Sequence, residues 1–428
     1  MAQRYDTYKD SGVQWLGNIP GHWGCVPVRR IAHVNPTRTK NLEADSYVGY
    51  APMEKIRCDK MNPSKIKVSK LTSGLTYCEE GDIVLAKVTP CFENGNLAIV
   101  PHVEQGCCYA SSELFVFRAK DKVLPRFLFY TFLNRGFINA GASTMRGTGG
   151  LKRVTTEFAN SAATPLPPLS EQNHIVSYLD EKCRKIDEWV NKKQKEVELL
   201  GEMKQRVIAD AVTRGLNPNV KMKATNIPWL PEVPEHWQVK RLATQFTGDI
   251  SINKEFEYKY AFKFNYGQLV PKNEIGNPEE WRDVYSKYSI IERGDILVNG
   301  LNLNYDFVSQ RVACAPSNGI ITSAYVVCRP RPGVNYDYYT YLFKGMDGQK
   351  LFHGMGTGIR LTLSFKELRK QLIPVPPIEE QEAIVSYINE RLEKIDLLTS
   401  KMQQEIDAIK EYKQRLICDV ATGQIKVC

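Results

Sequence analysis

Residues 165–179 read PLPPLSEQNHIVSYL, and residues 374–388 read PVPPIEEQEAIVSYI. The second stretch lies 209 positions after the first, and each has a proline pair, then Glu-Gln, then apolar residues at helical spacing. Prolines just before such a pattern are typical of a helix start. The sequence therefore predicts two long helices that begin at equivalent places in a duplicated chain.

The duplication extends outward from these stretches over nearly the whole chain. The matching segments are WLGNIPGHW (15–23) and WLPEVPEHW (229–237), GDI (81–83) and GDI (294–296), SELFVFR (112–118) and SAYVVCR (323–329), and GTG (147–149) and GTG (356–358). Their offset falls slowly from 214 to 209, as small loop deletions would cause. Such self-similarity identifies an internal repeat.

Each copy consists of a lobe followed by a helix. The lobes contain short apolar runs separated by Gly, Pro and Asn, which predicts strands and turns. We therefore expect an α+β fold with two similar mixed α/β lobes. The expected boundaries are a first lobe at 1–168, a central helix at 169–216, a second lobe at 217–377 and a C-terminal helix at 378–428.

The two helices share a narrow apolar seam. We expect the first to have Ser170 as its N-cap, with Asn173 at the box position. Apolar residues at alternating steps of three and four indicate a heptad seam, which must be covered by another helix. We therefore expect the two helices of one chain to form one antiparallel coiled coil; the alternative is pairing between chains. The seam residues are Ile175, Leu179, Ile186, Trp189, Val197, Leu200, Val207 and Ala211, then Ile384, Ile388, Ile395, Leu398, Met402, Ile406, Ile409, Leu416 and Val420.

Composition limits the location and partners of the chain. No apolar run approaches the roughly 20 residues that span a bilayer, and MAQRYDTYKD lacks the apolar core of a signal peptide, so we expect a cytoplasmic protein. The 11 cysteines follow no disulfide or zinc-site spacing, and we expect neither. The net charge of +9 modestly favours a polyanionic partner.

The proline-rich helix starts and the paired WLGNIPGHW and WLPEVPEHW segments resemble the specificity subunits of type I restriction–modification systems. The resemblance covers essentially the full length, including the order lobe, helix, lobe, helix. It implies two target-recognition domains, each reading one half of a split, asymmetric site in double-stranded DNA. It also implies that the chain docks two methyltransferase (modification) subunits and restriction/motor subunits, with S-adenosylmethionine, ATP and Mg used only in those partners.

The first group of candidate DNA contacts is glycine-rich and basic. It comprises Arg146, Lys152 and Arg153, with Arg360 in the second copy. Glycines let backbone N–H groups approach phosphate, and adjacent cations neutralise it. The alternative is a structural turn with solvated basic residues.

The second group lies where the two copies stop resembling each other between matching flanks. It comprises Lys87, Thr89 and Asn94 in the first copy and Asn299, Asn302, Asn304, Tyr305, Gln310 and Arg311 in the second. Two readers of different sequences should diverge here, and amide and basic side chains suit base edges. The alternative is that Asn and Gly only build turns. For Trp23 and Trp237 we favour packing under the lobe over base stacking.

No catalytic or metal-binding residues are expected. The Pro-Pro pairs follow Leu166 and Val375, whereas an amino-methyltransferase would need Asn or Asp there. The E-x-K spacings at 202–204 and 411–413 fall inside the long helices, where they are ordinary surface patterns. We therefore expect a non-catalytic recognition subunit. The alternatives are a coiled-coil scaffold for partners other than nucleic acid, and an autonomous DNA methyltransferase or nuclease.

Overall fold

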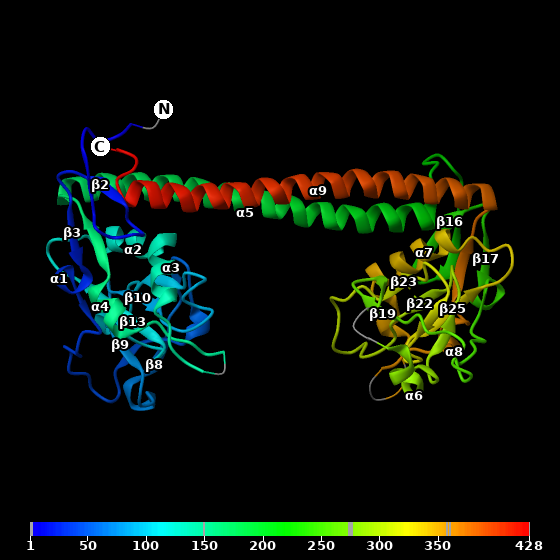
Figure 1. Cartoon of the computed structure of the whole chain (residues 1–428). Coiled ribbons are helices and arrows are strands. Elements are labelled where there is room, and N and C mark those ends of the chain that lie inside the picture. The colour runs from blue at the N-terminus through cyan, green and yellow to red at the C-terminus, as the bar shows by residue number, and fades with distance from the viewer. Residues whose placement is uncertain (1–2, 149, 273–276, 357, 359–360, 428) are drawn as a thin grey trace. The chain divides into compact units, whose positions relative to one another are not determined.

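The structure is a computed structural model that describes residues 3–148, 150–272, 277–356, 358 and 361–427. The chain forms two compact units (Figure 1). Unit 1 comprises Met1–Gln194 and Gln404–Cys428, and unit 2 comprises Lys195–Gln403. Each unit thus contains one lobe and one half of each long helix.

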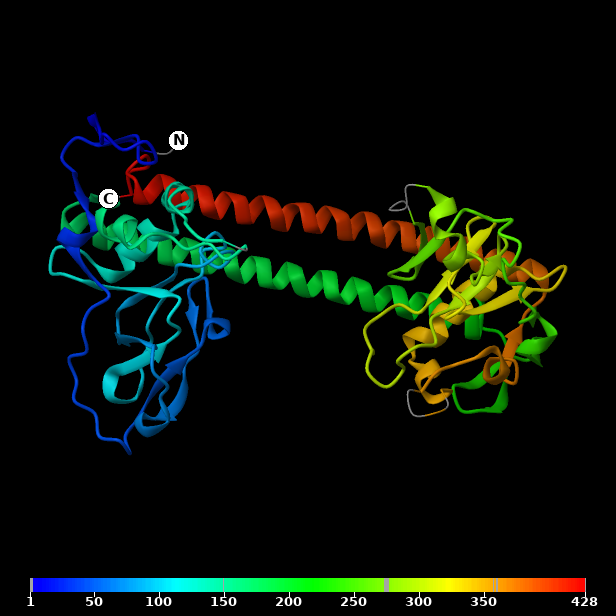
Figure 2. The same cartoon turned by 60° about the horizontal axis from the view of Figure 1, so that its bottom comes forward.

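The two long helices are α5 (Leu169–Arg214) and α9 (Ile378–Ala421), and they run beside each other in both views (Figures 1 and 2). In unit 1, the Lys413 ammonium lies 2.6 Å from an oxygen of Asp187. In unit 2, Lys204 pairs in the same way with Asp396. Residues late in α9 therefore meet residues early in α5, and the reverse holds in unit 2, so the helices are antiparallel as expected.

Most of the predicted seam is buried, with Ile175, Leu179 and Ile388 at 0% exposure. Two seam predictions were wrong, because Trp189 and Leu398 are 36% and 43% exposed. These two residues occupy equivalent positions in the repeat. A strict heptad drifts around a straight α-helix, so a position can leave the buried face although it fits the spacing.

The helix starts depend on the proline pairs rather than on Ser170. Helix α5 begins at Leu169, one residue before the N-cap that we expected, and the carbonyl of Pro168 accepts the first helical hydrogen bond from Gln172 N at 3.0 Å. The side chain of Gln172 is buried and donates to the carbonyl of Pro167 at 2.9 Å. Gln381 donates in the same way to Pro376 at 2.9 Å. A buried glutamine therefore fixes each turn into a helix.

The lobes repeat the same sheet arrangement. Unit 1 has an antiparallel sheet in the order β11-β10-β13-β4, and unit 2 has β18-β25-β22-β23, which is the same order read from the other edge. The strands are β4 (Ala32–Val34), β10 (Ile83–Ala86), β11 (Leu97–Ile99) and β13 (Leu114–Ala119), then β18 (Phe246–Thr247), β22 (Ile296–Val298), β23 (Val312–Cys314) and β25 (Val326–Pro330).

Further strands complete each lobe. Strand β14 (Ala163–Leu166) pairs with β3 (Gly24–Pro27) before α5, and β26 (Leu372–Val375) pairs with β17 (Gln238–Arg241) before α9. Unit 1 also contains β1 (Tyr8–Asp10), β2 (Asn18–Pro20), β5 (Tyr47–Ala51), β6 (Ile56–Arg57), β7 (Lys60–Met61), β8 (Ser64–Lys67), β9 (Thr76–Glu79) and β12 (Cys107–Ala110). Unit 2 also contains β15 (Met222–Ile227), β16 (Leu230–Pro234), β19 (Phe262–Asn265), β20 (Gln268–Pro271), β21 (Ser289–Ile291) and β24 (Gly319–Ile321).

Short helices cover the sheets. They are α1 (Val28–Ile31), α2 (Pro125–Leu133), α3 (Arg135–Ser143) and α4 (Thr156–Ser161) in unit 1, and α6 (Arg282–Tyr285), α7 (Tyr336–Gly348) and α8 (Phe365–Leu368) in unit 2.

The repeated GDI segment explains how the strands of each sheet are held. Asp82 is 2% exposed and accepts two hydrogen bonds of 2.8 Å from Arg118 on the adjacent strand. Asp295 is 1% exposed and accepts from Arg329 at 3.0 and 2.8 Å. A buried charge is tolerated only when it is paired and hydrogen-bonded. The aspartate and arginine therefore recur together in both copies.

A glutamate in the first turn of each long helix binds the lobe. Glu171 accepts hydrogen bonds from Trp23 Nε1 at 2.9 Å and Tyr5 at 3.1 Å, and lies 2.6 Å from His22 Nε2. Glu380 contacts His236 at 2.7 Å and accepts from Trp237. Both tryptophans are fully buried, which confirms that they pack under the lobes.

Unit 1 is built from two separate stretches of chain. Its main core includes Ile19 and Trp23 near the N-terminus together with Ile417 and Val420 from the end of α9. The Tyr8 hydroxyl donates to the carbonyl of Gly423 at 2.9 Å, and Lys426 N donates to the carbonyl of Gln3 at 2.8 Å. The core of unit 2, in contrast, comes from one continuous stretch.

We predict that Glu171→Gln lowers the free energy of unfolding of unit 1 by about 1 kcal/mol at pH 7, because charge-assisted hydrogen bonds are lost from a partly exposed site. Burial opposes the charge, but the hydrogen bonds from Trp23, His22 and Tyr5 outweigh it and lower the pKa of Glu171. The carboxylate therefore stabilises the fold above its unfolded pKa, and this contribution is lost as pH falls through the folded pKa.

Calorimetry of both proteins across pH 3–7 measures this difference, which should shrink below about pH 4. Glu188→Gln is the matched control, since this exposed glutamate on the same helix pairs with Arg184 one turn away. An equal loss in the two variants would contradict the prediction.

Candidate nucleic-acid interface

In unit 1, the structure brings the two candidate segments together. The β10 loop (87–96) lies against the basic loop (146–153): Thr89 N donates to the carbonyl of Lys152 at 2.9 Å, and Val154 N donates to that of Lys87 at 2.8 Å. An isolated β-bridge joins Val88 to Arg153. Two segments about 60 residues apart in sequence therefore form one surface.

A glycine closes the basic loop. Gly147 has φ of 149°, and a Cβ atom there would lie 2.2 Å from the carbonyl oxygen of Leu151. Any side chain at this position would collide with the backbone, so the close turn requires glycine. Gly149 lies outside the described residues. The turn exposes the side chains of Arg146 and Lys152.

The three basic residues of this loop have different electrostatic surroundings. Arg153 is exposed, but its guanidinium makes two hydrogen bonds of 2.8 and 2.7 Å to Glu113, and these lower the pKa of that carboxyl. Within the described residues, Arg146 and Lys152 make no ion pair. A phosphate could therefore pair with Arg146 or Lys152 without first breaking an ion pair with a carboxylate.

The remaining unit 1 candidates also differ from one another. The Thr89 hydroxyl donates to the carbonyl of Lys152 at 3.1 Å, which gives it a role in holding the two loops together. The Lys87 ammonium lies 5.7 Å from the ring centroid of Phe115. Asn94 is exposed. DNA contact by these residues stays a prediction, with Asn94 the most accessible.

Unit 2 repeats the arrangement with different residues. The β22 loop (299–311) lies against Gly356 and residues 361–363, and Leu363 N donates to the carbonyl of Gly300 at 2.9 Å. A Cβ atom on Gly356 would lie 2.9 Å from Leu303 Cδ1, so this approach is also close. Arg360, which we expected to contact phosphate, lies outside the described residues, as do Thr357 and Ile359.

The prediction that Arg311 contacts DNA was wrong. It is 1% exposed, and its guanidinium donates to the backbone carbonyls of Asn299, Leu301 and Asp306 at 2.9, 2.8 and 2.6 Å. A buried guanidinium that holds three loop carbonyls cannot also reach a base. Arg311 therefore shapes the β22 loop from inside.

The other unit 2 candidates occupy the loop that Arg311 shapes. Asn299 Oδ1 accepts a hydrogen bond from Leu301 N at 3.2 Å and so builds a turn. Asn302 is exposed with φ of 52°, whereas Asn304 is half-buried and its Oδ1 lacks a hydrogen-bond partner among the described residues. Tyr305 is 80% exposed, and Gln310 is exposed.

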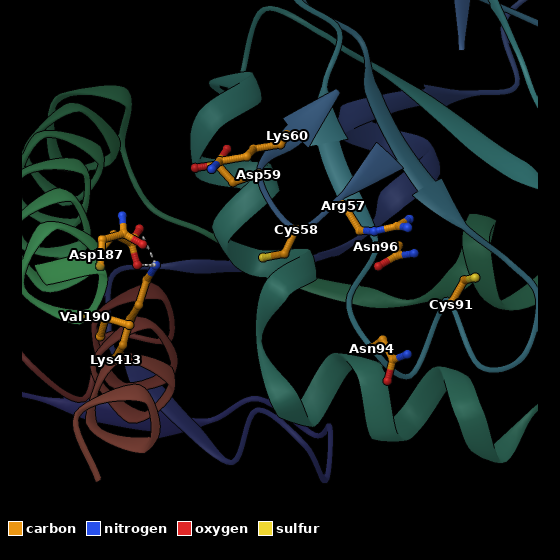
Figure 3. Close-up of a pocket in the computed structure, with 11 residues that line it drawn as sticks. Arg57, Cys58, Asp59, Lys60, Cys91, Asn94, Asn96, Asp187, Val190 and Lys413 are labelled. Carbon is orange, nitrogen blue, oxygen red and sulfur yellow. Dashed lines mark hydrogen bonds and ion pairs between the residues drawn. The ribbon is translucent and has the colours of Figure 1, made fainter. Parts of the chain in front are cut away.

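Each unit also has a cavity between its divergent loop and its helix pair. The unit 1 cavity of about 850 Å³ lies between Asn94 of the β10 loop and the Asp187–Lys413 pair, with Arg57 and Lys60 on the lobe side (Figure 3). The unit 2 cavity of about 440 Å³ is lined by Gln310 and by the equivalent Asp396–Lys204 pair. Sequence reasoning missed Arg57 and Lys60, because their segment, 56–61, carries no repeat or motif.

The described residues contain no cluster of three or more His, Cys, Asp or Glu side chains arranged to hold a metal ion. The helices within those residues also include none that is both long and apolar enough to cross a membrane.

A comparison with family models matches residues 20–199 and 284–408 to the type I restriction modification DNA specificity domain. The matched segments cover most of the chain and fall in both repeats. The chain belongs to this family. Membership in a specificity family implies a recognition role rather than a catalytic one.

Individual relatives agree with this assignment. The chain is 29% identical over 287 residues to the type I restriction enzyme EcoAI specificity subunit of Escherichia coli, an alignment that spans 65% of this chain and less than half (46%) of that protein. It is 22% identical over 438 residues to the putative type I restriction enzyme MjaX specificity subunit of Methanocaldococcus jannaschii, covering 96% of each.

A solved structure shares the fold. A chain from a study of complex assembly and conformational transition in a type I R-M system matches with a TM-score of 0.71 at 20% identity, covering 95% of this chain and 99% of that chain. The two chains therefore share one overall fold along almost their full lengths.

We predict that Arg146→Ala and Lys152→Ala each weaken binding to all duplexes and make the salt dependence shallower by about 0.9 per lost phosphate contact. Arg153→Ala should have a smaller effect, since Glu113 already pairs with this guanidinium. Glu113→Gln should strengthen binding and steepen the salt dependence, because it releases Arg153. Fluorescence anisotropy at several salt concentrations measures both quantities. Equal losses for all three basic residues would contradict the electrostatic distinction.

Proposed function

We propose that the chain is the DNA sequence-specificity subunit of a type I restriction–modification complex and reads a bipartite, asymmetric site in double-stranded DNA. One observation carries the proposal. The two lobes share a sheet order and a buried aspartate–arginine pair, whereas the loops on that frame differ. One frame with two different loop sets suits two readers of different half-sites.

The loops offer each half-site a different chemistry. In unit 1, Arg146 and Lys152 suit phosphate, and Asn94 suits a base edge. In unit 2, the exposed residues of the β22 loop include Asn302, Tyr305 and Gln310, which are uncharged. A polar amide can make two hydrogen bonds with adenine, so both lobes have the means for direct reading.

The helix pair supports the proposal that two methyltransferase subunits dock on the chain. Unit 1 exposes Trp189 and Tyr412 on its helices at 36% and 51%, and unit 2 exposes Leu398 and Met203 at 43% and 47%. Trp189 is equivalent to Leu398, and Met203 to Tyr412. Exposed apolar side chains at equivalent positions of the two units suit contact with another chain. A site that occurs once in each unit fits two copies of one partner, to which restriction/motor subunits then bind.

In this proposal the chain itself catalyses nothing and holds no cofactor. S-adenosylmethionine serves the methyltransferase subunits, and ATP and Mg serve the motor subunits. The complex works in the cytoplasm, where it meets the host DNA.

We predict that the purified chain alone neither methylates nor cuts DNA and that adding its methyltransferase subunits produces methylation at one split sequence. Base-resolved sequencing of the methylated DNA identifies the site. Turnover by the chain alone, at a rate that follows its concentration, would favour the autonomous enzyme. A complex without salt-sensitive DNA binding would favour the scaffold.

We also predict that the lobes read independently. Replacing 217–377 with the corresponding lobe of a relative should change one half of the methylated sequence, because each lobe has its own sheet and core. The reciprocal replacement of 1–168 is the matched control and should change the other half. Changes in both halves from a single replacement would contradict separate readers.

A further inference from the structure

The β22 loop ends in an apolar tip, formed by Tyr305, Phe307 and Val308. These side chains are 80%, 55% and 92% exposed. Exposing three neighbouring apolar side chains gives up the stabilisation that burying each would provide. Such a group on a folded surface indicates contact with a partner.

Hydrogen bonds and a ring stack fix the conformation of the apolar tip. Asp306 Oδ1 accepts hydrogen bonds from Val308 N and Ser309 N at 3.1 and 3.0 Å, and its carbonyl accepts from Arg311 at 2.6 Å. The Phe307 ring stacks on His353, with ring centroids 4.6 Å apart. The loop therefore presents Tyr305 and Val308 in one fixed arrangement, and binding would cost little ordering entropy.

The surroundings of the tip point to a nucleic acid. The cavity beside it is lined by Val308, Gln310, Lys344 and Lys350, and also by the carboxylates of Asp347 and Asp396. Within the described residues, neither of these lysines makes an ion pair. Cations beside exposed apolar and amide groups match a duplex, in which phosphates flank grooves that present polar base edges and thymine methyl groups.

A neighbouring turn extends the same surface. Tyr266 lies at the turn between β19 and β20 and is 85% exposed. The next residue, Gly267, packs so closely that a Cβ atom there would lie 2.6 Å from Gln310 Oε1. The turn therefore packs against Gln310, at the C-terminal end of the β22 loop.

We propose that the apolar tip makes direct, non-electrostatic contact with DNA bases and that Val308 and Tyr305 are specificity-determining residues of the second lobe. The inference rests on the proposed function and names the contact that one lobe uses. Apolar side chains contact thymine methyl groups or enter between base steps, and both contacts exclude water without pairing a phosphate.

In the described part of the first lobe, the β10 loop has no such apolar tip. Phe92, in the β10 loop, is fully buried, and the exposed residues around it are Pro90 and Asn94. The basic loop beside it exposes Arg146 and Lys152 instead, with Leu151 at 56%. The first lobe therefore offers its half-site mainly charged side chains, and the second lobe offers its half-site mainly apolar ones.

The test uses the complete complex with its methyltransferase subunits and a duplex that carries the methylated site identified by sequencing. Val308→Ser should weaken binding to this duplex by about tenfold, since it removes apolar area that is buried on binding. Its salt dependence should equal that of the wild type, because no phosphate contact is lost. Tyr305→Ala should act in the same direction.

Val284→Ser is the matched control, because Val284 is an exposed valine of the same lobe, at 40% exposure, outside the β22 loop. The affinity of the Val284→Ser complex for the duplex should equal that of the wild type. Unchanged affinity in Val308→Ser, in a complex that still methylates its site, would overturn the inference and leave the proposed function intact. A shallower salt dependence in this variant would also overturn it. A wild-type complex that prefers no sequence would instead refute the proposed function.

Discussion

A carboxylate in the first turn of each long helix hydrogen-bonds to the lobe that precedes the helix. Glu171 and Glu380 lie in the first helical turn and bind a histidine and a buried tryptophan of the lobe. A negative charge is also favoured at a helix N-terminus by the helix dipole. The buried glutamine that follows each glutamate fixes the turn from the last strand. The rest of the arrangement depends on this junction, since it sets the direction in which a helix leaves its lobe.

The repeat made the frame predictable, because duplicated spacing revealed the helices, their antiparallel pairing and the burial of Trp23 and Trp237. Contacts between distant segments were not predictable. Arg311 resembled a surface cation, yet it is buried under its loop. Arg153 resembled a phosphate ligand, yet Glu113, 40 residues earlier, pairs with it. The exposure of Trp189 and Leu398 depends on small rotations of a helix pair that heptad spacing alone does not determine.

Divergent loops on a common frame separate stability from recognition. The pairs Asp82–Arg118 and Asp295–Arg329 join adjacent strands within the sheets. The divergent loops begin where these strands end and take no part in the two pairs. Loop residues such as Tyr305 and Asn94 contribute little to either core. Their side chains can therefore change without a large loss of folding free energy.

The two-part construction of unit 1 has a consequence for synthesis. Its core needs residues 404–427, and these leave the ribosome only after all of unit 2. Unit 2 consists of one continuous segment, so its lobe and both of its helix halves are available together. The lobe that is translated first is thus completed last, when the end of α9 packs beside Trp23. A chain truncated before that point would carry a finished second lobe and an incomplete first one, so only full-length translation yields two complete lobes.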